Sequence, residues 1–126
     1  MKKIALLAAC AALTATPVLA DTAAELNIGQ NHAGMAAKAA DLKTTQMHLH
    51  HALNCLVGPS GDGFDAAPGN PCGKAGNGAI PDSADAGQKA KLQIAVNSAK
   101  AGLATTDLAA AQKDAQDTAD AIGAAK

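Results

Sequence analysis

Apolar residues recur every seven positions along the first half of the chain. The first row of this pattern is Ile28, Met35, Leu42, Leu49 and Leu56. A second row runs beside it and consists of His32, Ala39, Gln46 and Leu53. Two seven-residue rows offset by four positions are typical of the seam of a packed amphipathic helix. No proline interrupts residues 22–56, so the pattern predicts one long helix over this range.

A segment rich in glycine and proline follows, "VGPSGDGFDAAPGNPCGKAGNGAIP". It holds seven of the chain's 12 glycines and four of its five prolines. This composition excludes a regular helix or strand. A connection of this length is usually either functional or tethered to the domain. We therefore expect a long loop over residues 57–81.

The helical pattern returns at about residue 82, where Asp82 or Ser83 is the expected N-cap, and it continues to about residue 122. Gly123 is the expected C-terminal stop. The apolar face of this second helix contains Leu92, Ala95, Val96, Ala99, Leu103, Thr106 and Ala110. The sequence thus predicts an all-α fold, a long antiparallel helical hairpin with a glycine- and proline-rich loop. Two helices bury only one stripe each, so we expect either pairing into a four-helix bundle or an extra break in one long helix.

The N-terminus has the features of a secretory signal peptide. Met1-Lys2-Lys3 is basic, an apolar alanine-rich run follows, and small residues lead up to Ala20. We expect cleavage after Ala20, a single helical domain over residues 21–126 and a periplasmic location. No stable membrane insertion is expected after processing. A lipoprotein modified at Cys10 is the alternative, because Leu7-Ala8-Ala9-Cys10 resembles a lipoprotein cleavage box.

The predicted core is poor in large side chains. Leucine, isoleucine, valine and phenylalanine together number fifteen over residues 21–126, and alanine fills the deficit. A small domain with so thin a core usually needs a covalent link, a partner chain or a metal. Cys55 and Cys72 remain after processing, and an oxidising compartment favours a disulfide between them. The competing interpretation is that both cysteines are thiolate ligands of zinc or copper.

The composition argues against several functions. The chain has no arginine, tryptophan or tyrosine, so it lacks the side chains that bind phosphate in a bidentate manner or stack on bases, and we expect no nucleic-acid binding. A Cys-x-x-Cys-His haem motif is absent, and the loop carboxylates do not match calcium-site spacing. No nucleophile sits in a recognisable catalytic motif. We therefore expect a protein that is not an enzyme.

Three of the chain's four histidines lie within the stretch "QMHLHHALNC". At about 100° per residue on a helix, His48 and His51 share one side and His50 points to the other flank. Met47 lies within one helical turn of both His50 and His51. On an unbroken helix His32 would lie roughly 27 Å away along the axis. The first candidates for a metal site are therefore His48 and His51, followed by His50 and Met47, with His32 last.

A late transition metal is the expected ligand of these residues. Neutral imidazole binds copper, zinc and nickel, and a thioether adds a preference for Cu(I), so copper is preferred and zinc is possible. Two ligands rarely make a selective site. Asp85 is the expected third ligand from the second helix, unless a symmetric homo-oligomer brings two His48/His51 pairs together. For Met35, which lies on the leucine row, packing in the core is expected instead.

The signal peptide, the alanine-rich helices and the histidines without aromatic neighbours together resemble small metal-binding helical-bundle proteins of the bacterial periplasm. Those proteins carry histidines in repeats along several helices, whereas here they crowd into one turn and a half. The resemblance implies metal buffering, delivery or tolerance. The alternative is a non-enzymatic interaction module, in which the tethered loop presents Phe64 and Asp65 to a partner and the histidines are merely structural.

Overall fold

The computed structural model describes residues 20–126, so the predicted signal peptide and the Cys10 alternative lie outside the described residues. The helices are α1 (Thr22–Lys38), α2 (Leu42–Val57), α3 (Ala79–Asp82), α4 (Ala86–Ala104) and α5 (Leu108–Ala125). The predicted all-α class is confirmed. Over these residues, none of the helices combines the length and the apolar character needed to cross a lipid bilayer.

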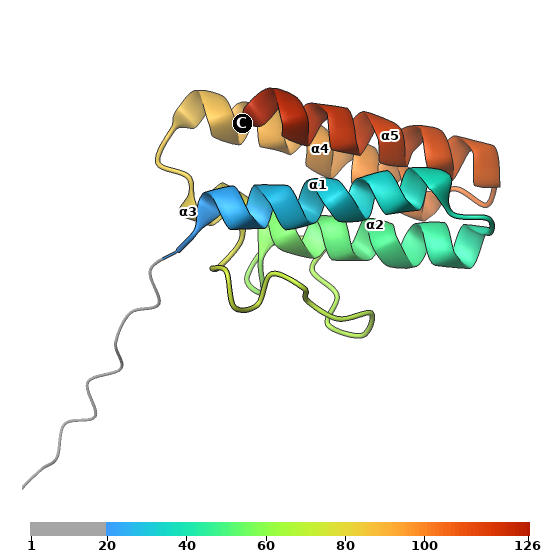
Figure 1. The fold of residues 1–126 in the computed structure, drawn as a ribbon, viewed down its shortest axis with the longest axis horizontal. Coiled ribbons are helices and arrows are strands. Elements are labelled where there is room, and N and C mark those ends of the chain that lie inside the picture. The colour runs from blue at the N-terminus through green and yellow to red at the C-terminus, as the bar shows by residue number, and fades with distance from the viewer. Residues whose placement is uncertain (1–19) are drawn as a thin grey trace, which may run out of the picture.

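The four long helices form an antiparallel bundle within one chain (Figure 1). Helix α1 packs between α2 and α5, and α4 packs against the same two helices from the other side. The side-chain amide of Gln46 at the start of α2 donates to the carbonyls of Leu103 and Thr105 at the end of α4. The bundle that was expected from two paired copies therefore forms from a single chain.

Each of the two predicted long helices is in fact two helices joined by a tight turn. The chain becomes extended at Ala39 (φ −67°, ψ 145°) and at Thr105 (φ −80°, ψ 151°), which ends α1 and α4. Asp41 and Asp107 then cap the next helices, each accepting a hydrogen bond from a backbone N–H three residues later. The prediction of uninterrupted helices over residues 22–56 and 82–122 was therefore wrong, and the alternative of an extra break in a long helix is what the structure has, in both halves of the chain.

The observed helix ends correct two further predictions. Aspartate caps all four long helices. Asp85, rather than Asp82 or Ser83, caps α4, and its carboxylate accepts a hydrogen bond from the backbone N–H of Gln88 at 2.5 Å. Helix α5 also runs through Gly123 to Ala125 instead of stopping at the glycine.

The core is built from a few large residues separated by alanines. Its largest apolar side chains with almost no exposure are Leu49, Leu53, Leu56, Leu92, Val96 and Ile122. Ten of the 20 buried hydrophobic residues in the described part of the chain are alanines, as the composition predicted. Met35 is an exception to the predicted pattern, because it is 43% exposed. Its place on the leucine row assumed that α1 and α2 were one helix, and the break after Lys38 removes it from that row.

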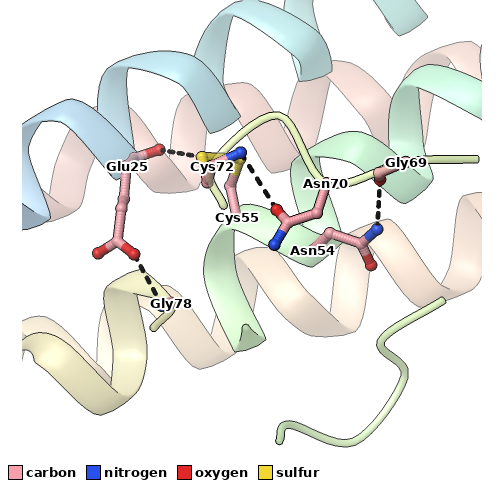
Figure 2. The surroundings of a disulfide bond; sticks show 7 residues. All are labelled: Glu25, Asn54, Cys55, Gly69, Asn70, Cys72 and Gly78. Atoms are coloured by element: carbon pink, nitrogen blue, oxygen red, sulfur yellow. Dashed lines mark hydrogen bonds between the residues drawn. A yellow bond between two sulfur atoms is a disulfide. The ribbon is translucent and has the colours of Figure 1, made fainter. Parts of the chain in front are cut away.

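The predicted disulfide between Cys55 and Cys72 is present, with the two Cα atoms 5.2 Å apart (Figure 2). It fastens the loop between α2 and α3 to the end of α2. Phe64 and Ile80 are partly buried and pack against the core. The loop is thus covalently and sterically held on the bundle, which agrees with the expectation of a tethered connection.

Candidate metal centre

Three histidines converge between α1 and α2. His32 lies on α1, and His48 and His51 lie on α2. One ring nitrogen from each of the three lies within 4.8 Å of the others. The ring centroids are 4.7 Å apart for His32 and His51, 5.4 Å for His32 and His48, and 5.8 Å for His48 and His51. The turn at residues 39–41 causes this convergence, because it folds α1 back along α2.

Small residues allow α1 and α2 to approach closely enough for the three histidines to meet. Ala33 and Ala36 of α1 and Ala52 of α2 are fully buried. Gly29 faces the same contact, where an added Cβ atom would come within 3.3 Å of the Cβ of Cys55. Alanine and glycine at this contact reduce the distance between the axes of α1 and α2. The imidazoles that these two helices carry therefore come within contact distance of one another.

The nearest pair of ring nitrogens has the spacing that a metal requires. Nδ1 of His32 and Nδ1 of His48 are 3.2 Å apart, so in neutral rings one of them donates a hydrogen bond to the other. Two nitrogens at about 2.0–2.1 Å from a tetrahedral zinc ion lie roughly 3.3 Å apart. A bound metal would replace the shared hydrogen atom, which moves to Nε2 of the same ring.

His51 has one ring nitrogen occupied and the other available. Its Nε2 lies 2.6 Å from the carbonyl oxygen of Pro68 in the tethered loop. A carbonyl can only accept, so Nε2 carries the hydrogen atom and Nδ1 carries a lone pair. This Nδ1 is buried and has no hydrogen-bond partner in the described structure. Buried polar atoms without partners are rare, and a lone pair of this kind among other imidazoles is a metal-ligand arrangement.

Burial favours the neutral form of two of the imidazoles, His32 and His48. Burial, together with the neighbouring imidazoles of His51 and His48, lowers the pKa of His32 to about 4. Burial also lowers the pKa of His48, and the nearby His51 adds to this effect. Neutral imidazole is the form that binds metal ions. His32 and His48 are therefore ready to bind a metal at neutral pH without first releasing a proton.

The structure brings together the predicted pair His48 and His51 and adds His32, the last of the sequence candidates. His50 lies outside the cluster, and Met47 lines a hollow with His50 rather than the one with His48. The hollow of His50 and Met47 is open, has a volume of about 900 Å³ and is also bordered by Pro68. The buried Nδ1 of His50 has no hydrogen-bond partner either, but the described residues place no second cluster of metal-ligating groups around it.

Asp85, the carboxylate expected as third ligand, is not part of the cluster. The expectation assumed that α2 and its partner helix pivot at the loop. Instead, α3 and the residues before α4 displace the start of α4, and Gln46 of α2 meets the end of α4 at Leu103. Asp85 lies beside Ala125 and Lys126 at the other end of the bundle.

One side of the site opens to solvent. His48 lines a hollow of about 720 Å³ together with Met35, Lys38 and Thr44. The thioether of Met35, which is 43% exposed, is accessible in this hollow. A metal ion or a small ligand can therefore reach the histidines without opening the bundle.

Sequence reasoning missed the two groups that support His51, Pro68 and Asn54. Asn54 lies three residues after His51 on α2, which places both side chains on the same face of the helix. A fully buried asparagine directly before a disulfide cysteine is a signal that a loop is being held. The Pro68 contribution comes from a backbone carbonyl, so no side-chain motif reveals it.

Comparison with protein families, characterised proteins and solved structures finds no match to this chain. No family is therefore assigned. What the structure itself shows is a helical protein with a three-histidine cluster that could hold a metal ion.

Proposed function

We propose that this protein binds a late transition metal ion, copper or zinc, through His32, His48 and His51. The proposal rests on the surroundings of the His51 ring. Its Nδ1 is buried without a hydrogen-bond partner, and the ring lies beside two other imidazoles. Folding buries this atom at a cost in solvation, and a metal bond offsets that cost.

The ligand set favours copper or zinc. Three neutral imidazoles without a carboxylate suit copper, zinc and nickel and suit hard ions such as magnesium poorly. Three protein ligands leave a fourth position open, which is a feature of sites that exchange their ligand rather than of closed structural sites. The accessible thioether of Met35, which lines the same hollow as His48, favours Cu(I) as the incoming form. Copper is therefore the preferred metal and zinc the second choice.

A role in metal buffering, delivery or tolerance in the periplasm fits these properties. The signal-peptide pattern supports that location, and the open side of the site supports exchange with another carrier. The proposal involves no catalytic reaction. An interaction module that presents Phe64 has less support, because Phe64 packs against the core and is held under the loop.

Metal titration of the purified, chelator-stripped protein tests the proposal. We expect one Cu(I), Cu(II) or Zn(II) ion to bind per chain with sub-micromolar affinity, measured by competition with a chromogenic chelator. Replacing His32, His48 or His51 with alanine should lower the affinity by at least about 100-fold, more than the loss of a group that only supports a ligand.

The matched control is His50→Ala. His50 lies between the two ligands on α2 but outside the cluster, so its replacement should leave the affinity within about threefold of wild type. The proposal is wrong if the stripped protein binds none of these ions. It is also wrong if His50→Ala weakens binding as much as His51→Ala does.

A further inference from the structure

The tethered loop contributes a backbone group to the metal centre. The Pro68 carbonyl oxygen lies 2.6 Å from Nε2 of His51 and accepts its hydrogen bond. This bond selects the tautomer of His51 in which Nδ1 is unprotonated. It also fixes the rotation of the ring about its Cβ–Cγ bond, so Nδ1 points toward one place. Metal-ligating histidines commonly have such a carbonyl or carboxylate partner on their other nitrogen, and its loss typically weakens metal binding 10- to 100-fold.

Asn54 holds the part of the loop that carries Pro68. Its side-chain amide donates to the carbonyl of Asp65 at 2.6 Å and to that of Gly69 at 2.7 Å. Its side-chain oxygen accepts from the backbone N–H of Asp65 at 3.0 Å. The two anchored residues lie on either side of Pro68. Asn54 is fully buried, so water does not compete for these three bonds.

The disulfide limits how far the same segment can move. Cys55 follows Asn54 directly, and its partner Cys72 lies four residues after Pro68. The backbone N–H of Cys72 donates to the side chain of Asn70, which shapes the chain just before the bridge (Figure 2). Figure 2 shows Asn54 and Cys55 at adjacent positions of α2, facing the loop that returns past Gly69 and Asn70. Asn54 thus holds the chain on both sides of Pro68, and the covalent link adds a further restraint on the side of Gly69.

We propose that Asn54 is a positioning residue of the metal centre, which acts by placing the Pro68 carbonyl on His51. The inference rests on the proposed metal-binding function and deepens it, because it gives the glycine- and proline-rich loop a role in setting affinity. Asn54 touches no metal itself. It determines which nitrogen of His51 is free and where that nitrogen points.

The first test is a nuclear magnetic resonance spectrum of the metal-free wild-type protein with ¹⁵N-labelled histidine. We expect the imidazole signals of His51 to show the tautomer with hydrogen on Nε2, and Nδ1 to change its shift when Zn(II) is added. A His51 signal with hydrogen on Nδ1, or zinc bound through Nε2, would overturn the inference. This measurement needs no variant and does not depend on how well a substituted protein folds.

The second test compares Asn54→Ala with the control Asp82→Ala. Asp82 accepts hydrogen bonds from the backbone and side chain of Asn77, so its loss loosens the loop at the end away from Pro68. We expect Asn54→Ala to weaken Zn(II) binding about 10- to 100-fold and to give a mixture of His51 tautomers. Asp82→Ala should change neither.

Unchanged affinity and tautomer in a folded Asn54→Ala protein would refute the positioning role. If His51→Ala abolishes binding in the same assay, the proposed metal function stands and only this inference fails. If the wild type binds no metal at all, the proposed function fails, and the tautomer spectra alone decide whether Asn54 and Pro68 fix the His51 ring. If circular dichroism shows that Asn54→Ala does not fold, the tautomer spectra of the wild-type protein decide whether the inference holds.

Discussion

The disulfide should supply a large share of the stability of this bundle. The perturbation is the double replacement of Cys55 and Cys72 with alanine, which leaves no unpaired thiol. The two cysteines are 17 positions apart in the sequence. On the chain-entropy model, releasing a loop of this size costs about 3 kcal/mol of unfolding free energy. A domain of this size typically has about 5–15 kcal/mol in total, so the loss is substantial.

The core offers little to compensate for that loss. Half of the buried hydrophobic residues in the described part are alanines, which bury a small area each. Cys55 and Cys72 are themselves 0% and 2% exposed, so their sulfur contacts disappear with the bond. The thin core leaves little stability in reserve, and the lost sulfur contacts add to the entropic cost.

The loss of unfolding free energy is measured by urea denaturation in the presence of a chelator, with far-ultraviolet circular dichroism as the signal. With a denaturant slope of about 1–3 kcal/mol per molar, the midpoint should fall by about 1–3 M urea. Wild-type protein treated with a reductant is the control and should move in the same direction. A loss below about 1 kcal/mol would refute the reasoning, because it would mean that Asn54 and the packed Phe64 already restrict the loop without the covalent bond.

Three further predictions concern titratable and exposed side chains. Burial lowers the pKa of His32 to about 4 in the folded, metal-free protein, below the ordinary 6.5, so the unfolded chain binds more protons between these values. Stability should therefore fall as the pH drops from about 6.5 to about 4, and His32→Asn should flatten that dependence in urea titrations. Burial raises the pKa of Glu25, so its favourable contribution is present at low pH and is lost as the pH rises through the folded value. Glu25→Gln, which keeps the acceptor for the backbone N–H of Gly78, should then unfold at higher urea than wild type at pH 8 but not at pH 4. Replacing Met35 with leucine should change stability by less than about 0.5 kcal/mol, because Met35 is exposed, and should lower the affinity for Cu(I) but not for Zn(II) in chelator competition.

The helical class and most of the core could be predicted from the sequence, because they depend on periodicity. Leu49, Leu53, Leu92 and Val96 were expected on buried faces, and all four are buried. The helix breaks were not predictable in the same way. No glycine or proline marks residues 39–41 or 105–107, and alanine-rich sequence favours helix on both sides. A single capping aspartate, such as Asp41, is a weak signal within so strong a helical background.

The candidate site was predictable only where its residues share a helix. His48 and His51 are three positions apart, so their common face follows from helix geometry alone. His32 joins them through tertiary structure, and the estimate of its distance failed together with the assumption of an unbroken helix. The parts of the site contributed by the loop depend on a backbone carbonyl and on a buried amide, and neither leaves a recognisable motif.

The short turn at residues 39–41 has a consequence for the order in which the protein assembles. All three histidines of the cluster lie within residues 32–51, on one helical hairpin with a small sequence separation. Contacts between residues close in sequence form early, since little chain entropy is lost in closing them. The pairing of α1 with α5 joins the two ends of the domain and needs the longest closure. The hairpin of α1 and α2, with its histidine cluster already assembled, should therefore form before the second hairpin docks.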